Sequence, residues 1–164
     1  MAEGWEIIES VDIPSATSGC QFQNIPQTYF HLMVDFCWSA ASSGDSMKIR
    51  INSDSGNNYD YFRNYAANGS TYQDSGTSRS YYQATHDVNA YSDAPLVGQL
   101  WFTDYRNSSK FRQVLSVAGN RQGWAIHTGS NKATTAISNI YIYTNVGNNI
   151  RVGSHFQLWG LMSS

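Results

Sequence analysis

The chain has 164 residues, of which 14% are aromatic and only 13% are charged, and its formal net charge is −2. This length fits one domain, and the near-neutral charge, with Lys and Arg scattered singly, excludes a general attraction to nucleic-acid phosphates. No apolar stretch approaches the roughly 20 residues that cross a bilayer, so we expect a single domain over residues 1–164 without a nucleic-acid partner or membrane insertion.

The expected elements are strands, because apolar and polar residues alternate along much of the chain. Strands are expected, in chain order, at residues 30–38, 47–51, 97–105, 111–117, 123–128, 140–143 and 154–161. Residues 5–13 and 20–25 alternate less clearly and are further strand candidates. Clusters of Gly, Asn and Ser between these strands predict tight turns. The pattern predicts an all-β fold, an antiparallel β-sandwich with a jelly-roll-like arrangement. The side chains expected to point inward are Leu32, Val34, Phe36, Ile49, Ile51, Phe156 and Leu158.

Residues 57–95 break this pattern, because they are polar, irregular and rich in tyrosine. A loop this long in a compact domain is usually functional, or else it contains short strands that periodicity does not reveal. Tyr and Trp are enriched in protein interfaces, and their rings also stack on sugars; we favour the interface. The candidate interface residues are Trp5, Tyr59, Tyr61, Tyr65, Tyr72, Tyr81, Tyr82 and Tyr91.

The sequence shows no catalytic constellation. All three glutamates lie within the first nine residues, and most aspartates lie in turn-like contexts, although the fold could bring Asp35 and Asp104 together. No His has a metal-ligand spacing, and no Ser lies in a nucleophile-elbow motif. We therefore expect no enzyme activity, no cofactor and no metal; a calcium site at Asp54–Asp60 is the weaker alternative to a simple turn.

Cys20 and Cys37 lack metal-ligand spacing. Burial as free thiols is the favoured interpretation, and a disulfide would require the two flanking strands to pair. Residues 1–13 are acidic and do not resemble a secretory signal. We expect synthesis in a cytoplasm, followed by release through lysis or as part of a larger particle.

The last strand reads Gly153-Ser154-His155-Phe156-Gln157-Leu158-Trp159-Gly160-Leu161. It resembles the Gly-Ser-x-Phe-x-Leu-Tyr-Gly-Ile ending of a group of bacteriophage virion proteins. Ile51 to Tyr59 is similar to the Phe-Asn-Asp-Ser-Gly-x-Asn-Tyr segment of that group, and Gly123-Trp124 followed by Ile140-Tyr141-Ile142 matches its layout. Trp159 stands where Tyr is usual, and we expect a free-standing chain, whereas many members of the group form the C-terminal part of a longer fibre protein.

The resemblance implies a virion location and a role as a capsid decoration protein or head-fibre subunit. A glycan-binding receptor module of a tail fibre is the alternative. We further expect a homo-oligomer, a trimer, bound to the major capsid protein or another virion protein, with host surface glycan as the other candidate partner. Residues 1–13, around Trp5, are the candidate anchoring segment.

Overall fold

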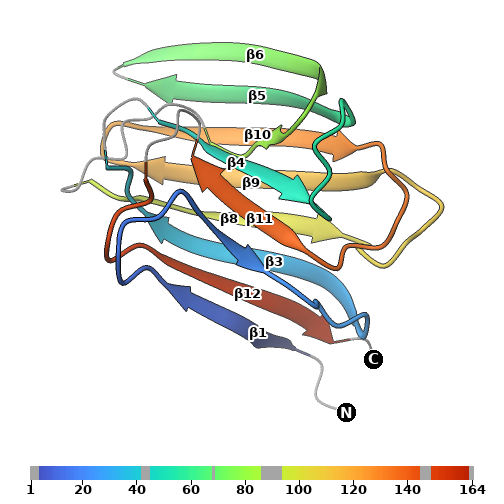
Figure 1. The fold of residues 1–164 in the computed structure, drawn as a ribbon. Coiled ribbons are helices and arrows are strands. Elements are labelled where there is room, and N and C mark those ends of the chain that lie inside the picture. The colour runs from blue at the N-terminus through green and yellow to red at the C-terminus, as the bar shows by residue number, and fades with distance from the viewer. Residues whose placement is uncertain (1–3, 42–44, 68, 86–93, 145–148, 163–164) are drawn as a thin grey trace.

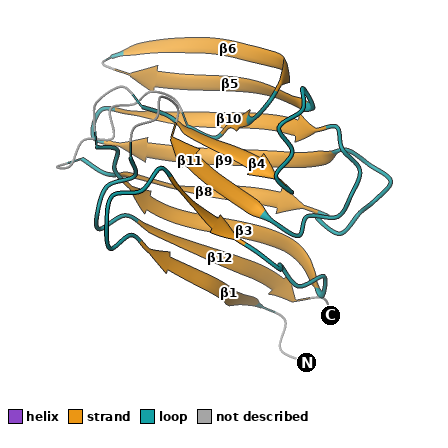
Figure 2. Ribbon diagram, viewed as in Figure 1, coloured by secondary structure: helices purple, strands orange, loops and turns teal. Residues whose placement is uncertain are grey.

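The computed structural model describes residues 4–41, 45–67, 69–85, 94–144 and 149–162. This part of the chain is all β, with strands in two antiparallel sheets (Figures 1 and 2). The strands are β1 (Trp5–Asp12), β2 (Gly19–Phe22), β3 (Tyr29–Trp38), β4 (Met47–Ile51), β5 (Tyr59–Ala67), β6 (Ser70–Arg79), β7 (Tyr82–Gln83), β8 (Leu96–Thr103), β9 (Arg112–Asn120), β10 (Gly123–Asn131), β11 (Ile140–Thr144) and β12 (His155–Met162). The described residues include no helix of the length and apolarity that a bilayer requires.

The large sheet has eight strands in the order β1-β12-β3-β8-β9-β10-β5-β6, and the small sheet has four in the order β2-β11-β4-β7. The small sheet lies in front of the middle of the large sheet in Figure 1. The predicted β-sandwich is therefore confirmed. The strand order does not establish a jelly roll, which stays a prediction.

One hydrophobic core fills the space between the sheets. The seven side chains predicted to point inward are all buried there. Near the β1 edge of the large sheet, β3 and β12 pair so that Phe36 lies opposite Phe156 and Val34 opposite Leu158. Strand alternation thus located the inner face of both strands correctly.

The described part of residues 57–95, which leaves out 68 and 86–93, is mostly strand, in contrast to the expected irregular loop. Strands β5 and β6 form a hairpin at one edge of the large sheet, and β7 pairs with β4 in the small sheet. Strand β6 is exposed along nearly its whole length. An edge strand with two solvated faces has no need to alternate apolar and polar residues, so its sequence carries little period-two signal.

The two cysteines are free. Cys20 lies on β2 in the small sheet and Cys37 on β3 in the large sheet, so the flanking strands do not pair. Burial, aided by the negative charge of Glu9, raises the pKa of the Cys20 thiol to about 12. Cys20 is therefore a buried apolar side chain without thiolate reactivity.

Candidate functional site

Three of the predicted interface tyrosines belong to the core. Tyr59, Tyr61 and Tyr82 are buried, so this part of the interface prediction is wrong. The Tyr59 hydroxyl accepts a hydrogen bond from the amide of Ile51 at 2.9 Å, and the Tyr82 hydroxyl donates one to the carbonyl of His127 at 2.9 Å. Burial raises the pKa of both phenols well above the usual value. The amphipathic rings fill the core, and each hydroxyl still finds a polar partner.

Two other candidates form an aromatic pair on the β5–β6 hairpin, in which Tyr72 is exposed and Tyr65 is half-buried. Tyr65 lies directly opposite Tyr72, and their rings stack with centroids 5.1 Å apart. The guanidinium of Arg63 lies 5.4 Å from the centre of the Tyr65 ring. This pair is accessible to a partner at the open edge of the sheet.

The remaining candidates are dispersed over the molecule. Tyr81 is half-buried, with the ammonium of Lys48 3.5 Å from its ring centre. Trp5 meets Trp101 edge to face with ring centroids 5.5 Å apart, at the opposite edge of the large sheet from the hairpin. Tyr91 lies outside the described residues. The structure therefore does not gather the eight predicted residues into one site.

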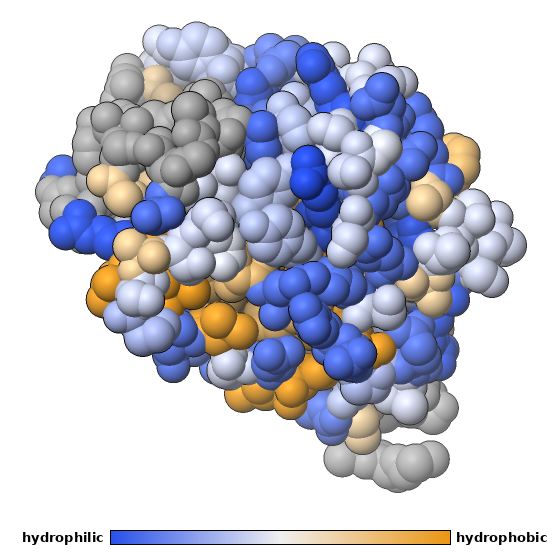
Figure 3. Space-filling view, in the orientation of Figure 1, coloured by the Kyte–Doolittle hydropathy of each residue, from blue (hydrophilic) through white to orange (hydrophobic). Residues whose placement is uncertain are grey.

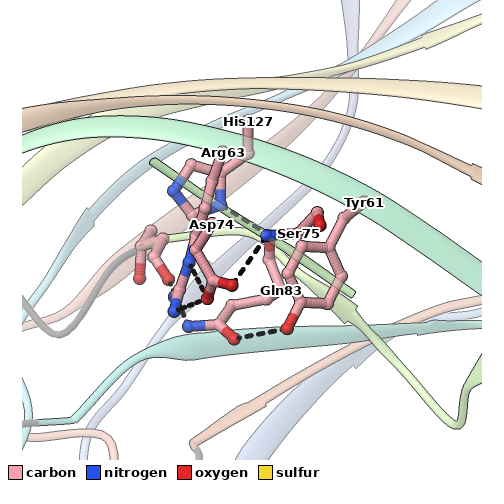
Figure 4. Close-up of polar contacts among 7 residues, drawn as sticks. Tyr61, Arg63, Asp74, Ser75, Gln83 and His127 are labelled. Atoms are coloured by element: carbon pink, nitrogen blue, oxygen red, sulfur yellow. Dashed lines mark hydrogen bonds and ion pairs between the residues drawn. The ribbon is translucent and has the colours of Figure 1, made fainter. Parts of the chain in front are cut away.

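A polar cluster lies beneath the hairpin (Figure 4). The Tyr61 hydroxyl donates to the side-chain oxygen of Gln83 at 3.4 Å, and Nδ1 of His127 lies 2.8 Å from the Gln83 carbonyl. Arg63 pairs with Asp74 on the neighbouring strand. His127 is fully buried, so a substrate in solvent cannot reach its ring. The cluster joins β5, β6, β7 and β10 and has a structural role.

The loop considered for calcium uses its carboxylate internally. Asp54 accepts hydrogen bonds from the Gly56 amide at 2.8 Å, from Asn58 at 3.0 Å and from Asn131 at 3.1 Å. Burial on its own would raise the pKa of Asp54, but these bonds outweigh it and hold the pKa below the usual value. The bonds occupy both carboxylate oxygens and fix the turn before β5.

The other candidate aspartates do not form a pair of facing carboxylates. Asp60 pairs with Lys132 at 2.9 Å. Asp35 lies on β3 opposite Gln99, while Asp104 follows the far end of β8, so the two do not face each other. Among the described residues, no three His, Cys, Asp or Glu side chains lie close enough together to hold a metal ion.

A group of exposed apolar side chains lies on the large sheet, on the side away from the small sheet. We call this side the outer face. Its apolar band consists of Phe62, Val97, Leu115, Val117, Trp124 and Ile126, each between 38% and 53% exposed. Within the band Val117 of β9 lies directly opposite Ile126 of β10, and Leu115 lies opposite Trp101 of β8. The band therefore crosses β8, β9, β10 and β5 without interruption by a charged residue.

A hollow of about 520 Å³ borders the band, lined by Asn64, Thr71, Tyr72, Gln73 and Trp124. Trp124 lies between Ala66 on β5 and Gly119 on β9, and these small neighbours leave much of its indole exposed. An aromatic face beside amide and hydroxyl groups suits a sugar ring.

The opposite side of the molecule is different in character. The outer side of the small sheet carries Tyr141 and Tyr143, whose rings stack 5.1 Å apart, with Arg50 5.2 Å from the Tyr143 ring. Figure 3 views this side, where hydrophilic and intermediate residues dominate and hydrophobic residues gather toward β1 and β12. The two broad surfaces of the sandwich thus differ in polarity.

The apolar band was not predicted from the sequence, although the composition of one strand indicates it. Strand β9 carries apolar residues on both faces, with Val114 and Ala118 inward and Leu115 and Val117 outward, a composition typical of a strand covered on both sides. Comparisons with protein-family models, with curated proteins and with solved structures found no match.

Proposed function

We propose that this chain is a non-catalytic structural protein of a bacteriophage virion, a capsid decoration protein or head-fibre subunit. It acts through protein–protein contacts as a homo-oligomer, a trimer, attached to the major capsid protein or another virion protein. The virion location rests on the resemblance of Gly153–Leu161 and Ile51–Tyr59 to virion proteins. In this proposal β1, which contains Trp5, is the anchoring segment.

The observation that carries the protein-contact part is the apolar band on the outer face. The largest apolar patch on a protein surface is often a functional one. By contrast, the polar groups of the buried His127 and the half-buried Asp54 make hydrogen bonds within the protein. The exposed apolar side chains of the outer face suit contact between proteins.

The test is co-sedimentation of the purified chain with capsids of the phage that encodes it. We expect the chain to pellet with capsids at a fixed stoichiometry, and to remain in the supernatant without them. Failure to bind capsids, fibres or tails of that phage would reject the virion proposal. Light scattering on the free chain measures the copy number, and a value other than three would reject the trimer alone.

Glycan binding is the second candidate, and the hollow beside Trp124 favours it. The indole supplies a stacking surface, and Asn64, Gln73 and Thr71 supply the donors and acceptors that sugar hydroxyls require. A glycan array with the wild-type chain tests it directly. If the hollow is a sugar site, Trp124→Ala abolishes binding, whereas Phe111→Ala, which removes another exposed aromatic ring, leaves it unchanged.

A further inference from the structure

We propose that the apolar band on the outer face is covered by the same face of a second copy of this chain. This inference rests on the proposed function, since it names the partner for the surface that carries that function. Because a contact between two identical faces is two-fold and joins copies in pairs, it predicts a dimer in place of the trimer. It is argued from three features of the face: the apolarity of its strands, its lack of charge and its area.

The first feature is that the central strands carry apolar residues on both sides. Strand β8 places Leu100 and Phe102 in the core, and Trp101 between them points outward. Strand β9 likewise places Val114 in the core and Leu115 on the outer face. Strands with apolar residues on both faces belong to sheets covered on both faces. In the described structure the small sheet covers one face only, so the composition of these strands anticipates a further layer.

The second feature is the absence of charge from the middle of this face. Its outward positions on β8, β9 and β10 are Val97, Gln99, Trp101, Thr103, Gln113, Leu115, Val117, Gly119, Trp124, Ile126, Thr128 and Ser130. None of these twelve residues is acidic or basic. A partner chosen by opposite charge would find no countercharge here, whereas two copies of a neutral face meet without like-charge repulsion. Charge depletion is also typical of the centre of an interface.

The third feature is area. Six residues that each expose 38% to 53% of their surface present on the order of 500 Å², toward the upper end of what a monomer leaves exposed in one patch. The polar side chains Gln99, Gln113 and Thr128 lie among them. With these included, the face approaches the roughly 800 Å² per partner of a standard stable interface. Sheets that pack face to face interdigitate such side chains, so the sheet of a second copy fits this surface.

The test compares two substitutions of the same kind. Val117→Arg places a charge at the centre of the band, where an interface would leave it buried and unpaired. Val152→Arg makes the same change in an exposed turn outside the sheets. Both valines are exposed in the single chain, so both variants should fold, which circular dichroism verifies. Sedimentation equilibrium then measures the mass of each.

We expect a dimer for the wild type and for Val152→Arg. For Val117→Arg we expect a monomer, with a dissociation constant raised on the order of 100-fold. A wild type that is monomeric at its highest soluble concentration, a wild type that is a trimer, or a Val117→Arg variant that associates like the wild type would overturn the inference. Ile126→Lys, on the adjacent strand, should repeat the Val117→Arg result.

The same variants separate this inference from the proposed function. If the wild type is a monomer and still pellets with capsids, the virion proposal stands and the second-copy interface is wrong. If the wild type is an oligomer that Val117→Arg dissociates, but no virion component binds it, the interface stands and the virion proposal is wrong.

Discussion

Phe156 shows how a single side chain holds the two sheets together. It lies on β12, fully buried, opposite Phe36 on β3. Removing its ring would leave a cavity that the surrounding strands can close only in part. The cost therefore includes both the lost transfer free energy and the lost packing contacts.

We predict that Phe156→Ala lowers the free energy of unfolding by about 3–5 kcal/mol. Phe111→Ala is the matched control, because Phe111 is an exposed phenylalanine and should cost less than about 1 kcal/mol. Urea denaturation followed by tryptophan fluorescence measures both. Equal losses for the two variants would contradict the assignment of Phe156 to the core.

Asp54 makes stability depend on pH. Its folded-state pKa is lowered, despite the opposing effect of burial, by hydrogen bonds from Asn131, Asn58 and Gly56. Its contribution to stability is therefore present above the unfolded-state pKa of about 3.9 and is lost as the pH falls through the lower folded-state value. Asp54→Asn should destabilise the protein at neutral pH, and the difference from the wild type should shrink in acid. Urea titrations at several pH values measure it; a difference that is constant with pH would contradict this account.

The same bonds lead to a prediction about metal. Both oxygens of Asp54 accept hydrogen bonds within the loop, and Asp60 pairs with Lys132. We expect a chelator to leave the melting temperature unchanged, because these carboxylates already have partners. A drop of several degrees with EDTA that calcium restores would make Asp54–Asp60 a metal site.

At the scale of elements, β12 packs closely under the ring of Tyr29, and this close contact requires a glycine at position 160. The ring of Tyr29, at the start of β3, lies over Gly160, and a Cβ atom there would overlap it. The Tyr29 hydroxyl donates to Glu6 on β1. This one ring therefore ties β1, β12 and β3 together at the edge of the large sheet.

We predict that Gly160→Ala destabilises the protein by about 1–3 kcal/mol, the usual cost of forcing a group into a filled site. Gly4→Ala is the control, because an added Cβ there meets no atom within 4 Å. Thermal unfolding monitored by circular dichroism distinguishes the two. Equal melting temperatures for Gly160→Ala and the wild type would show that Tyr29 moves aside without cost.

The sequence predicts best the strands in which apolar and polar residues alternate. Strand β4 is expected at residues 47–51 and lies at Met47–Ile51, since its apolar inward residues alternate with the charged residues Lys48 and Arg50. Strand β6 was not predicted, because both of its faces are solvated and no period-two constraint acts on Ser70–Arg79. Tyrosine content also misled the assignment of the interface, since Tyr59 and Tyr82 satisfy their hydroxyls inside the core. A tyrosine in a sequence does not reveal whether its hydroxyl will find a buried partner.

At the scale of the whole molecule, the large sheet offers two kinds of contact surface, its edges and its outer face. The edge strand β1 carries Glu6, Glu9 and Asp12, and acidic side chains on an edge oppose pairing with another copy of it. The outer face carries no such charge across its three central strands. Sequence alone could not separate these surfaces, because the order of strands in the sheet decides which residues become neighbours.

The last prediction follows from this difference and concerns salt. If copies associate through the apolar band, sodium chloride has no charge pairs at the contact to screen, so the dissociation constant should change less than about threefold between low and high salt. Ammonium sulfate should lower it, because excluded salts strengthen the burial of apolar surface. If instead β1 were the contact, through Glu6, Glu9 and Asp12, sodium chloride would change the association strongly. Sedimentation equilibrium across a salt series measures both trends, with Val152→Arg as the control for an added surface charge. A dissociation constant that changes strongly with sodium chloride would contradict the contact through the outer face and indicate one through the charged edge strand β1.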